Sequence, residues 1–288
     1  MEVIKDIAKA AIIWAGQNCM FTLARDETQA ALRGPFLVIA PHPDDETLGC
    51  GAFIARARAS GQTVRIVIVL DDDRDATHRS GFIAELRRQE ALKASATLGV
   101  APDNVVFLKQ PDGAAQTHID AIEKGLGEQV RLTCPTLVLS PYGEDKHSDH
   151  RAVAEAVNRL HRKGLIACPV YEYPIWFWLP NGLDHLLRMD RIRCLRRIHA
   201  RAYVPTKTTA MKAHRSQYPK LLGGLSEGLF QPFSFRIQFF ARYEVFFEKR
   251  PRFLATVPTE DEIQTRDSDL RTIELRKVLP GHAYAKHL

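Results

Sequence analysis

The stretch Pro41-His42-Pro43-Asp44-Asp45-Glu46 places an imidazole and three carboxylates side by side, directly after an apolar run. Burying such carboxylates without a cation costs on the order of several kcal/mol each. A divalent metal ion offsets that cost, so the stretch predicts a metal site. The alternative is that Asp44 to Glu46 only cap the helix that follows and complement its dipole.

The stretch His147-Ser148-Asp149-His150-Arg151 offers the same chemistry about 100 residues later. Histidine and carboxylate ligands without thiolate are typical of catalytic zinc, which takes three protein ligands and keeps one position open for water. His42, Asp45 and His150 are the predicted ligands. Because Fe²⁺ and Co²⁺ accept the same donors, zinc is a first expectation and not a deduction.

Hydrolysis by a zinc-bound water also needs a general base to take the proton of the attacking water. Asp44 is the predicted base, because it lies beside the predicted ligand Asp45. His147 is expected to act as an acid or to stabilise an oxyanion, with Asp149 orienting it. Together these residues predict hydrolysis of an acyl bond or a similar polar bond.

The elements around both polar stretches predict a parallel sheet. Apolar strands are expected at 36–40, 63–70, 105–108, 136–140 and 168–173, and helices at 47–60, 80–98, 117–131 and 149–163. This alternation is typical of right-handed βαβ units, so we expect a Rossmann-like α/β fold with a mainly parallel sheet and helices on both faces. Parallel strands end at one edge of the sheet, so both polar stretches are predicted to lie there.

The predicted domain covers residues 35–250, between an N-terminal helical extension (1–34) and a C-terminal tail (251–288). The extension has apolar residues at helical spacing, namely Ile4, Ile7, Ala8, Ala11, Ile12 and Ala15. We expect this face to pack on the domain, and the alternative is a helix lying on a membrane surface. Residues 188–201 are rich in arginine and predict an exposed edge strand, while 206–222 predict a helix broken near Pro219. The aromatic residues of 171–178 are expected either at a cleft mouth or in the core.

The composition is that of an ordinary globular protein, with 45% hydrophobic and 26% charged residues in a chain of 288. The net charge of +6 permits an anionic substrate, an acidic membrane surface or nucleic acid, and selects none of them. No stretch approaches the roughly 18 apolar residues that span a bilayer, and the N-terminus is a poor signal peptide, so a cytoplasmic protein is expected. Five scattered cysteines are expected to be reduced core thiols.

The two polar stretches, together with Thr47-Leu48-Gly49-Cys50-Gly51, resemble the PIG-L/LmbE family of zinc-dependent N-deacetylases. The resemblance is strong over residues 35–175. Supporting pieces are Arg87-x-x-Glu90, Pro111-Asp112-Gly113 and Lys212-x-His214-x-Ser216-Gln217. Members of that family remove acetyl groups from N-acetylglucosamine units in glycolipids, glycosides and small thiol precursors. The resemblance implies zinc on His42, Asp45 and His150, with Asp44 as base and His147 assisted by Asp149.

Two loops depart from the family pattern, Asp71-Asp72-Asp73-Arg74 and Glu144-Asp145-Lys146. Both are expected to border the substrate, so the reaction type is better specified than the substrate. The resemblance implies a small-molecule or lipid-linked N-acetyl amino sugar as substrate, and it leaves peripheral membrane contact and the oligomeric state open. A metal phosphoesterase is the first alternative, although such enzymes usually use two-metal sites. A nucleic-acid-binding protein is the second, although no such motif occurs and no nucleic-acid partner is expected.

Overall fold

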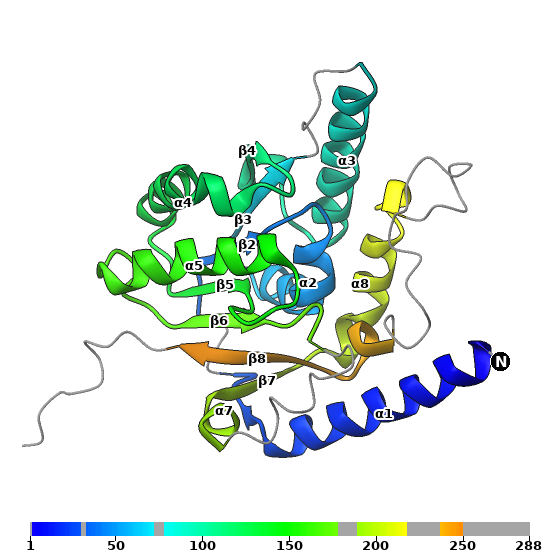
Figure 1. Ribbon diagram of the computed structural model, residues 1–288. Helices are drawn as coiled ribbons and strands as arrows, with labels where there is room; N and C mark the ends of the chain where they lie inside the picture. Colours follow the sequence, from blue (N-terminus) through cyan, green and yellow to red (C-terminus); the bar gives the residue numbers. More distant parts are fainter. Residues whose placement is uncertain (1, 30–32, 72–77, 178–188, 218–236, 250–288) are drawn as a thin grey trace, which may run out of the picture. The chain divides into compact units, whose positions relative to one another are not determined.

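The computed structural model describes residues 2–29, 33–71, 78–177, 189–217 and 237–249, and these contain an eight-stranded sheet with helices on both faces (Figure 1). The strands are β1 (Arg25–Asp26), β2 (Phe36–Ala40), β3 (Val64–Asp71), β4 (Val105–Pro111), β5 (Leu137–Pro141), β6 (Val170–Tyr173), β7 (Leu195–His199) and β8 (Tyr243–Lys249). The helices are α1 (Glu2–Leu23), α2 (Asp45–Ala59), α3 (His78–Thr97), α4 (Ile119–Thr133), α5 (Ser148–Arg162), α7 (Met189–Cys194) and α8 (Val204–Met211).

The strands lie in the order β1-β7-β8-β6-β5-β2-β3-β4. Neighbouring strands pair in parallel, except that β8 pairs antiparallel with β6 and β7. The predicted α/β fold with a mainly parallel sheet is therefore confirmed. The chain leaves β2 toward β3 and β4 on one side and returns to β5 and β6 on the other. This reversal of direction at β2 is the place where open α/β sheets bind ligands.

Two cores explain why the central strands are apolar along their whole length. Successive side chains of a strand point to opposite faces. In β2, Phe36 and Val38 pack in the core that includes residues of α2, α3 and α8, whereas Leu37 and Ile39 pack in the core with residues of α4 and α5. All of β2 is buried, as expected for a strand covered on both faces.

Helix α1 packs through a different face from the predicted one. The residues that it buries include Ala10, Ile13, Met20 and Phe21, which lie against β7, β8 and the 3₁₀ turn Ile237–Phe240. The predicted face is exposed, with Ile7 at 59% and Ile12 at 55% of full exposure. Both sides of this helix are apolar, so periodicity alone did not identify the packed side. The large side chains near its C-terminus decide the matter, because Phe21 packs on Tyr243 with ring centroids 5.3 Å apart.

Replacing Ile13 with alanine is expected to cost about 2 kcal/mol or more of unfolding free energy, because Ile13 is 8% exposed and its removal leaves a cavity. The adjacent Ile12→Ala is the matched control, and we expect a change of about 0.5 kcal/mol or less. Urea unfolding of both variants measures the difference. A larger loss in Ile12→Ala than in Ile13→Ala would mean that α1 packs through the face that the sequence predicted.

The basic segment 188–201 is built differently from its prediction. It forms α7 and then β7, and β7 lies between β1 and β8, so it is not an edge strand. Arg196 is buried and pairs with Glu248, and the Arg197 guanidinium lies 3.3 Å from Asp26. These two arginines are therefore engaged in ion pairs that stabilise the sheet edge, and they offer no free anion site.

Several other predicted boundaries also shift or fall outside the described residues. The helix expected at 206–222 is shorter, because α8 ends at Met211 and a 3₁₀ turn follows at Arg215–Gln217. Pro219, the turn from Asp72 to Arg74 and the tail 251–288 lie outside the described residues. Cys19 and Cys134 are exposed and not in the core, while Cys50 is buried as expected. Within the described part of the chain, no helix is long and apolar enough to cross a membrane.

Candidate metal centre and active site

The order of the strands brings the two polar stretches together. β2 pairs directly with β5, so the loops after Ala40 and Pro141 leave the sheet side by side. The first loop carries His42 and leads into α2, whose first residue is Asp45. The second carries His147 and leads into α5, which holds Asp149 and His150 in its first turn.

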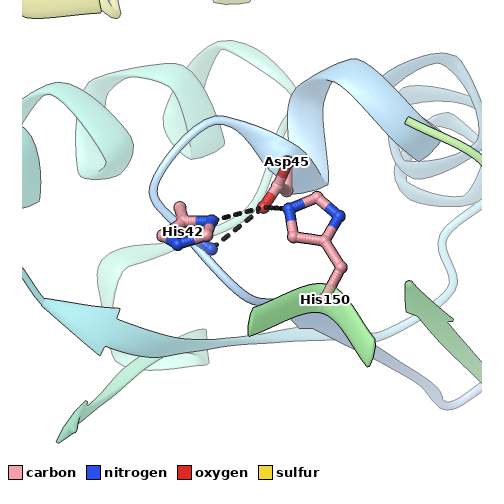
Figure 2. Close-up of side chains that lie close together, drawn as sticks. All are labelled: His42, Asp45 and His150. Atoms are coloured by element: carbon pink, nitrogen blue, oxygen red, sulfur yellow. Dashed lines mark hydrogen bonds and ion pairs between the residues drawn. The ribbon is translucent and has the colours of Figure 1, made fainter. Parts of the chain in front are cut away.

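His42, Asp45 and His150 converge on one point, as Figure 2 shows. Asp45 Oδ2 lies 3.3 Å from His42 Nδ1 and 3.2 Å from His150 Nε2, and it also accepts the main-chain N–H of His42 at 3.0 Å. Asp45 and His150 are buried, and His42 is half-buried. Two imidazoles and one carboxylate that can all face one centre form a donor set that suits a catalytic divalent metal.

The charges of this group interact strongly. Burial disfavours an imidazolium, but the nearby Asp45 and Asp145 carboxylates outweigh it and raise the pKa of His150 to about 9. Burial likewise opposes the charged form of His42, yet Asp112, Asp149 and Asp45 raise the pKa of His42 well above its usual value. For Asp45, the two imidazoles overcome burial and hold the pKa far below its ordinary range. Without a metal, protonated histidines therefore supply the positive charge that the buried carboxylate needs.

Asp44 lies beside this centre in an unusual backbone conformation, with φ of 125°. Its Oδ2 is buried and has no hydrogen-bond partner in the structure. Burial and the negative charge of Asp45 raise the pKa of Asp44 to about 8. A buried carboxyl group with a raised pKa and a free oxygen is suited to accept and release a proton near neutral pH.

His147 lies next to the centre, with its ring centroid 5.0 Å from those of both His42 and His150. Burial and these two imidazoles lower the pKa of His147, so it is neutral at pH 7. Its Nδ1 accepts the main-chain N–H of Asp149 at 3.3 Å. We assign the ring proton to Nε2 on this basis, which makes Nε2 a hydrogen-bond donor.

The carboxylate of Asp149 contacts residues other than His147. Its carboxylate lies 3.3 Å from His42 Nε2 and accepts the main-chain N–H groups of Gly113 and Ala115 at 2.8 and 3.2 Å. The contact between Asp149 and His147 is made by the main chain of Asp149 and not by its carboxylate. Asp149 therefore orients His42 and holds the loop after β4 against the site.

Asp145 was expected to border the substrate, but it is 1% exposed and turned inward. Its Oδ2 lies 3.6 Å from His150 Nδ1 and accepts the main-chain N–H of Trp176 at 3.0 Å, while Oδ1 accepts that of His147 at 2.9 Å. A carboxylate behind the outer nitrogen of a metal-binding histidine is a recurring arrangement that fixes the ring. Asp145 lies two residues before His147 in the sequence. This spacing did not show whether its carboxylate would face the substrate or turn inward to His150.

Asp145→Asn is expected to weaken metal binding about 10- to 100-fold, because the carboxylate behind His150 would be lost. The matched control is Glu144→Gln, which removes the same charge from the neighbouring exposed position. Competition with a chromophoric chelator measures both affinities. An equal loss in both variants would point to the charge of the loop instead of the contact with His150.

A cavity of about 360 Å³ opens over the centre. Its lining includes all the predicted site residues (His42, Asp44, Asp45, His147, Asp149 and His150) together with Leu48, Arg87, Asp112, Ile175 and Trp176. Arg87 and Asp112 belong to pieces that the sequence comparison noted without a function. Of the aromatic patch, Trp176 lines the cavity, whereas Tyr171, Tyr173 and Phe177 are buried in cores and Trp178 lies outside the described residues.

Comparison with known proteins shows a similarity to one family of deacetylases. Residues 37–161 match the family model of PIG-L, described as GlcNAc-PI de-N-acetylase. An uncharacterized deacetylase of Escherichia coli (strain K12), YaiS, is 28% identical over 203 residues, which cover 66% of this chain and 95% of that protein. A probable N-acetyl-alpha-D-glucosaminyl L-malate deacetylase 2 of Bacillus anthracis is 24% identical over 189 residues, which cover 63% of this chain and 80% of that protein.

Solved structures show the same fold. The N,N'-diacetylchitobiose deacetylase of Pyrococcus horikoshii superposes with a TM-score of 0.57 at 20% identity, over 78% of this chain and 87% of that one. GalB of Pseudomonas putida KT2440, a 4-carboxy-2-hydroxymuconate hydratase, superposes with a TM-score of 0.50 at 19% identity, over 75% of this chain and 96% of that one. Because a hydratase shares the fold, the structural likeness identifies the fold and not the reaction. Residues 37–161 of this chain are therefore similar to the PIG-L family, GlcNAc-PI de-N-acetylase, and the chain shares its fold with a solved deacetylase.

Proposed function

We propose that this protein is a metal-dependent N-deacetylase that releases acetate from an N-acetyl amino sugar. The observation that carries the proposal is the buried trio of His42, Asp45 and His150, with the Asp44 carboxyl group beside it and a cavity above it. The family description and the deacetylases among its relatives support an N-acetylated sugar as the substrate.

The donor set fits a divalent cation such as Zn²⁺, with Fe²⁺ and Co²⁺ as alternatives, because it offers two imidazole nitrogens and a carboxylate oxygen in one buried place. Such a cation would be held by His42, Asp45 and His150, and it would polarise an acyl carbonyl and lower the pKa of a water molecule. Positive charge beside Asp45 would also favour the ionised form of Asp44, which a base requires.

The roles of the side chains follow from their positions. Asp44 accepts a proton from the water whose oxygen attacks the acetyl carbon. The N–H at His147 Nε2 donates a hydrogen bond to the carbonyl oxygen as negative charge develops there. When the C–N bond breaks, Asp44 returns the proton to the nitrogen, so that acetate and a free amine leave. Arg87, Asp112 and Trp176 supply a charged and an aromatic wall for the sugar.

The test is acetate release from a panel of N-acetylglucosamine compounds that are free, nucleotide-linked and lipid-linked. Metal-stripped protein and protein reloaded with Zn²⁺, Fe²⁺ or Co²⁺ are compared. We expect acetate release that depends on metal. The compound that is hydrolysed fastest will indicate the substrate class. If metal-loaded protein releases no acetate from any compound, deacetylation of amino sugars is the wrong reaction, and phosphoester substrates would be tested next.

A further inference from the structure

A buried polar group adjoins Asp44 and Asp45 along the chain and lies outside the cavity lining. It consists of Glu46, Thr47 and His214, which are 0%, 0% and 1% exposed. None of the three belongs to the ligand groups formed by the described residues. The proposed mechanism gives them no role, so their burial needs another reason.

Glu46 holds the turn that carries Asp44. Its Oε2 accepts the main-chain N–H of Asp44 at 3.0 Å. A non-glycine residue at a φ of 125° is strained, and such a conformation costs on the order of 1–3 kcal/mol. It persists only where surrounding contacts impose it. The carboxylate of Glu46 is the side-chain contact that reaches the strained residue's own amide.

Glu46 in turn depends on His214. The Nε2 atom of His214 lies 3.4 Å from Glu46 Oε1 and 3.4 Å from the Thr47 hydroxyl, and that hydroxyl donates to Glu46 Oε1 at 2.7 Å. A fully buried carboxylate needs a cation or several donors to offset its desolvation. His214 brings a ring nitrogen to this carboxylate from a segment far along the chain.

His214 is itself anchored from α3. The next residue but one, Ser216, donates its main-chain N–H to Glu90 Oε1 at 2.8 Å and its hydroxyl to Glu90 Oε2 at 2.6 Å. Glu90 is 7% exposed and Ser216 is 4% exposed, so this joint is inside the protein. The contacts run from Glu90 to Ser216, then through His214 and Glu46 to the backbone of Asp44.

We infer that His214 is a positioning residue that, through Glu46, fixes the strained backbone of Asp44 so that its carboxylate faces the cavity. This inference rests on the proposed function, in which Asp44 is the base. It differs from a purely structural role because it predicts loss of turnover without loss of metal or substrate binding. A displacement of about 1 Å at a reacting group costs roughly a hundredfold in rate.

The test compares His214→Phe, which keeps the ring shape without a donor, with His214→Gln, which retains a side-chain N–H. We expect His214→Phe to bind metal normally and to keep its KM, while kcat falls roughly a hundredfold. His214→Gln should recover about tenfold or more of that loss. His161→Gln, at a partly exposed histidine on α5, is the control and should match the wild type. Equal kcat in folded His214→Phe and wild type, or equal losses in the Phe and Gln variants, would overturn the inference.

A second measurement does not depend on activity. The crystal structure of metal-free His214→Phe should show Asp44 released from positive φ and its amide no longer bound to Glu46. If the variant does not fold, Glu46→Gln tests the same link, because it weakens the ion pair with a side chain of the same shape. An unchanged Asp44 conformation would refute the positioning role even if the protein proves to act on another substrate. If the wild-type protein releases no acetate from any compound and Asp44 is nevertheless displaced in His214→Phe, only the proposed reaction is refuted.

Discussion

Asp44→Asn will lower kcat by about 10²- to 10⁴-fold while the metal stays bound, because the amide occupies the same space and cannot accept the proton. The fold should tolerate this change. Since burial and Asp45 raise the pKa of Asp44 to about 8, the carboxyl group is largely neutral at pH 7 in the metal-free protein, and asparagine resembles that neutral form. Steady-state acetate release and metal content are measured on the same sample.

The matched control for Asp44→Asn is Asp120→Asn on α4. The Asp120 side chain is 91% exposed and pairs with Arg159, so the same chemical change is made far from the site. We expect wild-type kcat from this control. An Asp44→Asn protein with wild-type turnover would show that another group takes the proton, and a variant that loses its metal would show that Asp44 serves binding instead.

Metal affinity will rise steeply with pH, by up to about a hundredfold per pH unit between pH 7 and 9, because two imidazoles must lose protons before they can bind. The sign follows from the metal-free state. The pKa of His150 is raised to about 9 and that of His42 is also well above its usual value, so both rings are protonated at pH 7. At pH values below these pKa values, the apparent metal affinity falls about tenfold per protonated ring for each unit by which the pH is lowered.

Isothermal titration with Zn²⁺ in buffers of different ionisation enthalpy counts the released protons directly. At pH 7 we expect about two protons per metal ion from the histidines and up to about one more from Asp44 as it ionises, with fewer released at pH 9. Asp45→Asn is the informative comparison, because it removes one ligand together with the charge that helps hold the histidines protonated. That variant should bind far more weakly and release fewer protons. Proton release near zero at pH 7 in the unaltered protein would mean that the two histidines are neutral before the metal arrives.

The same two histidines affect stability in the metal-free protein. Their pKa values are raised on folding, so their contribution to stability is complete below about pH 6.5, the ordinary histidine pKa. For His150 it is lost as the pH rises through about 9. The carboxylate of Asp45 acts in the opposite direction, because its lowered pKa makes its contribution fade only in acid. Metal binding therefore replaces, at neutral and basic pH, the charge that the protons provide at lower pH.

Local sequence patterns were enough to predict the donor groups of the candidate site. Two polar stretches, each placed after an apolar strand and before a helix, specified the donors of the trio His42, Asp45 and His150 and put them at one edge of a parallel sheet. This works because hydrophobic periodicity and strand-to-helix turns are local properties, encoded within a few residues. The same locality explains why the strands β2, β3, β4, β5 and β6 were found near their predicted positions.

Local patterns did not predict which elements are neighbours. That β2 pairs with β5, that Asp145 turns inward behind His150, and that His214 reaches Glu46 from far along the chain are all long-range facts. So is the side of α1 that packs, since Ile12 and Ile13 are equally apolar and only one is buried. A local sequence pattern indicates whether a side chain is expected to be buried or exposed, but it does not indicate which residue that side chain contacts. Its partner is chosen by the packing of the whole domain, which balances burial and charge among residues that the sequence keeps apart.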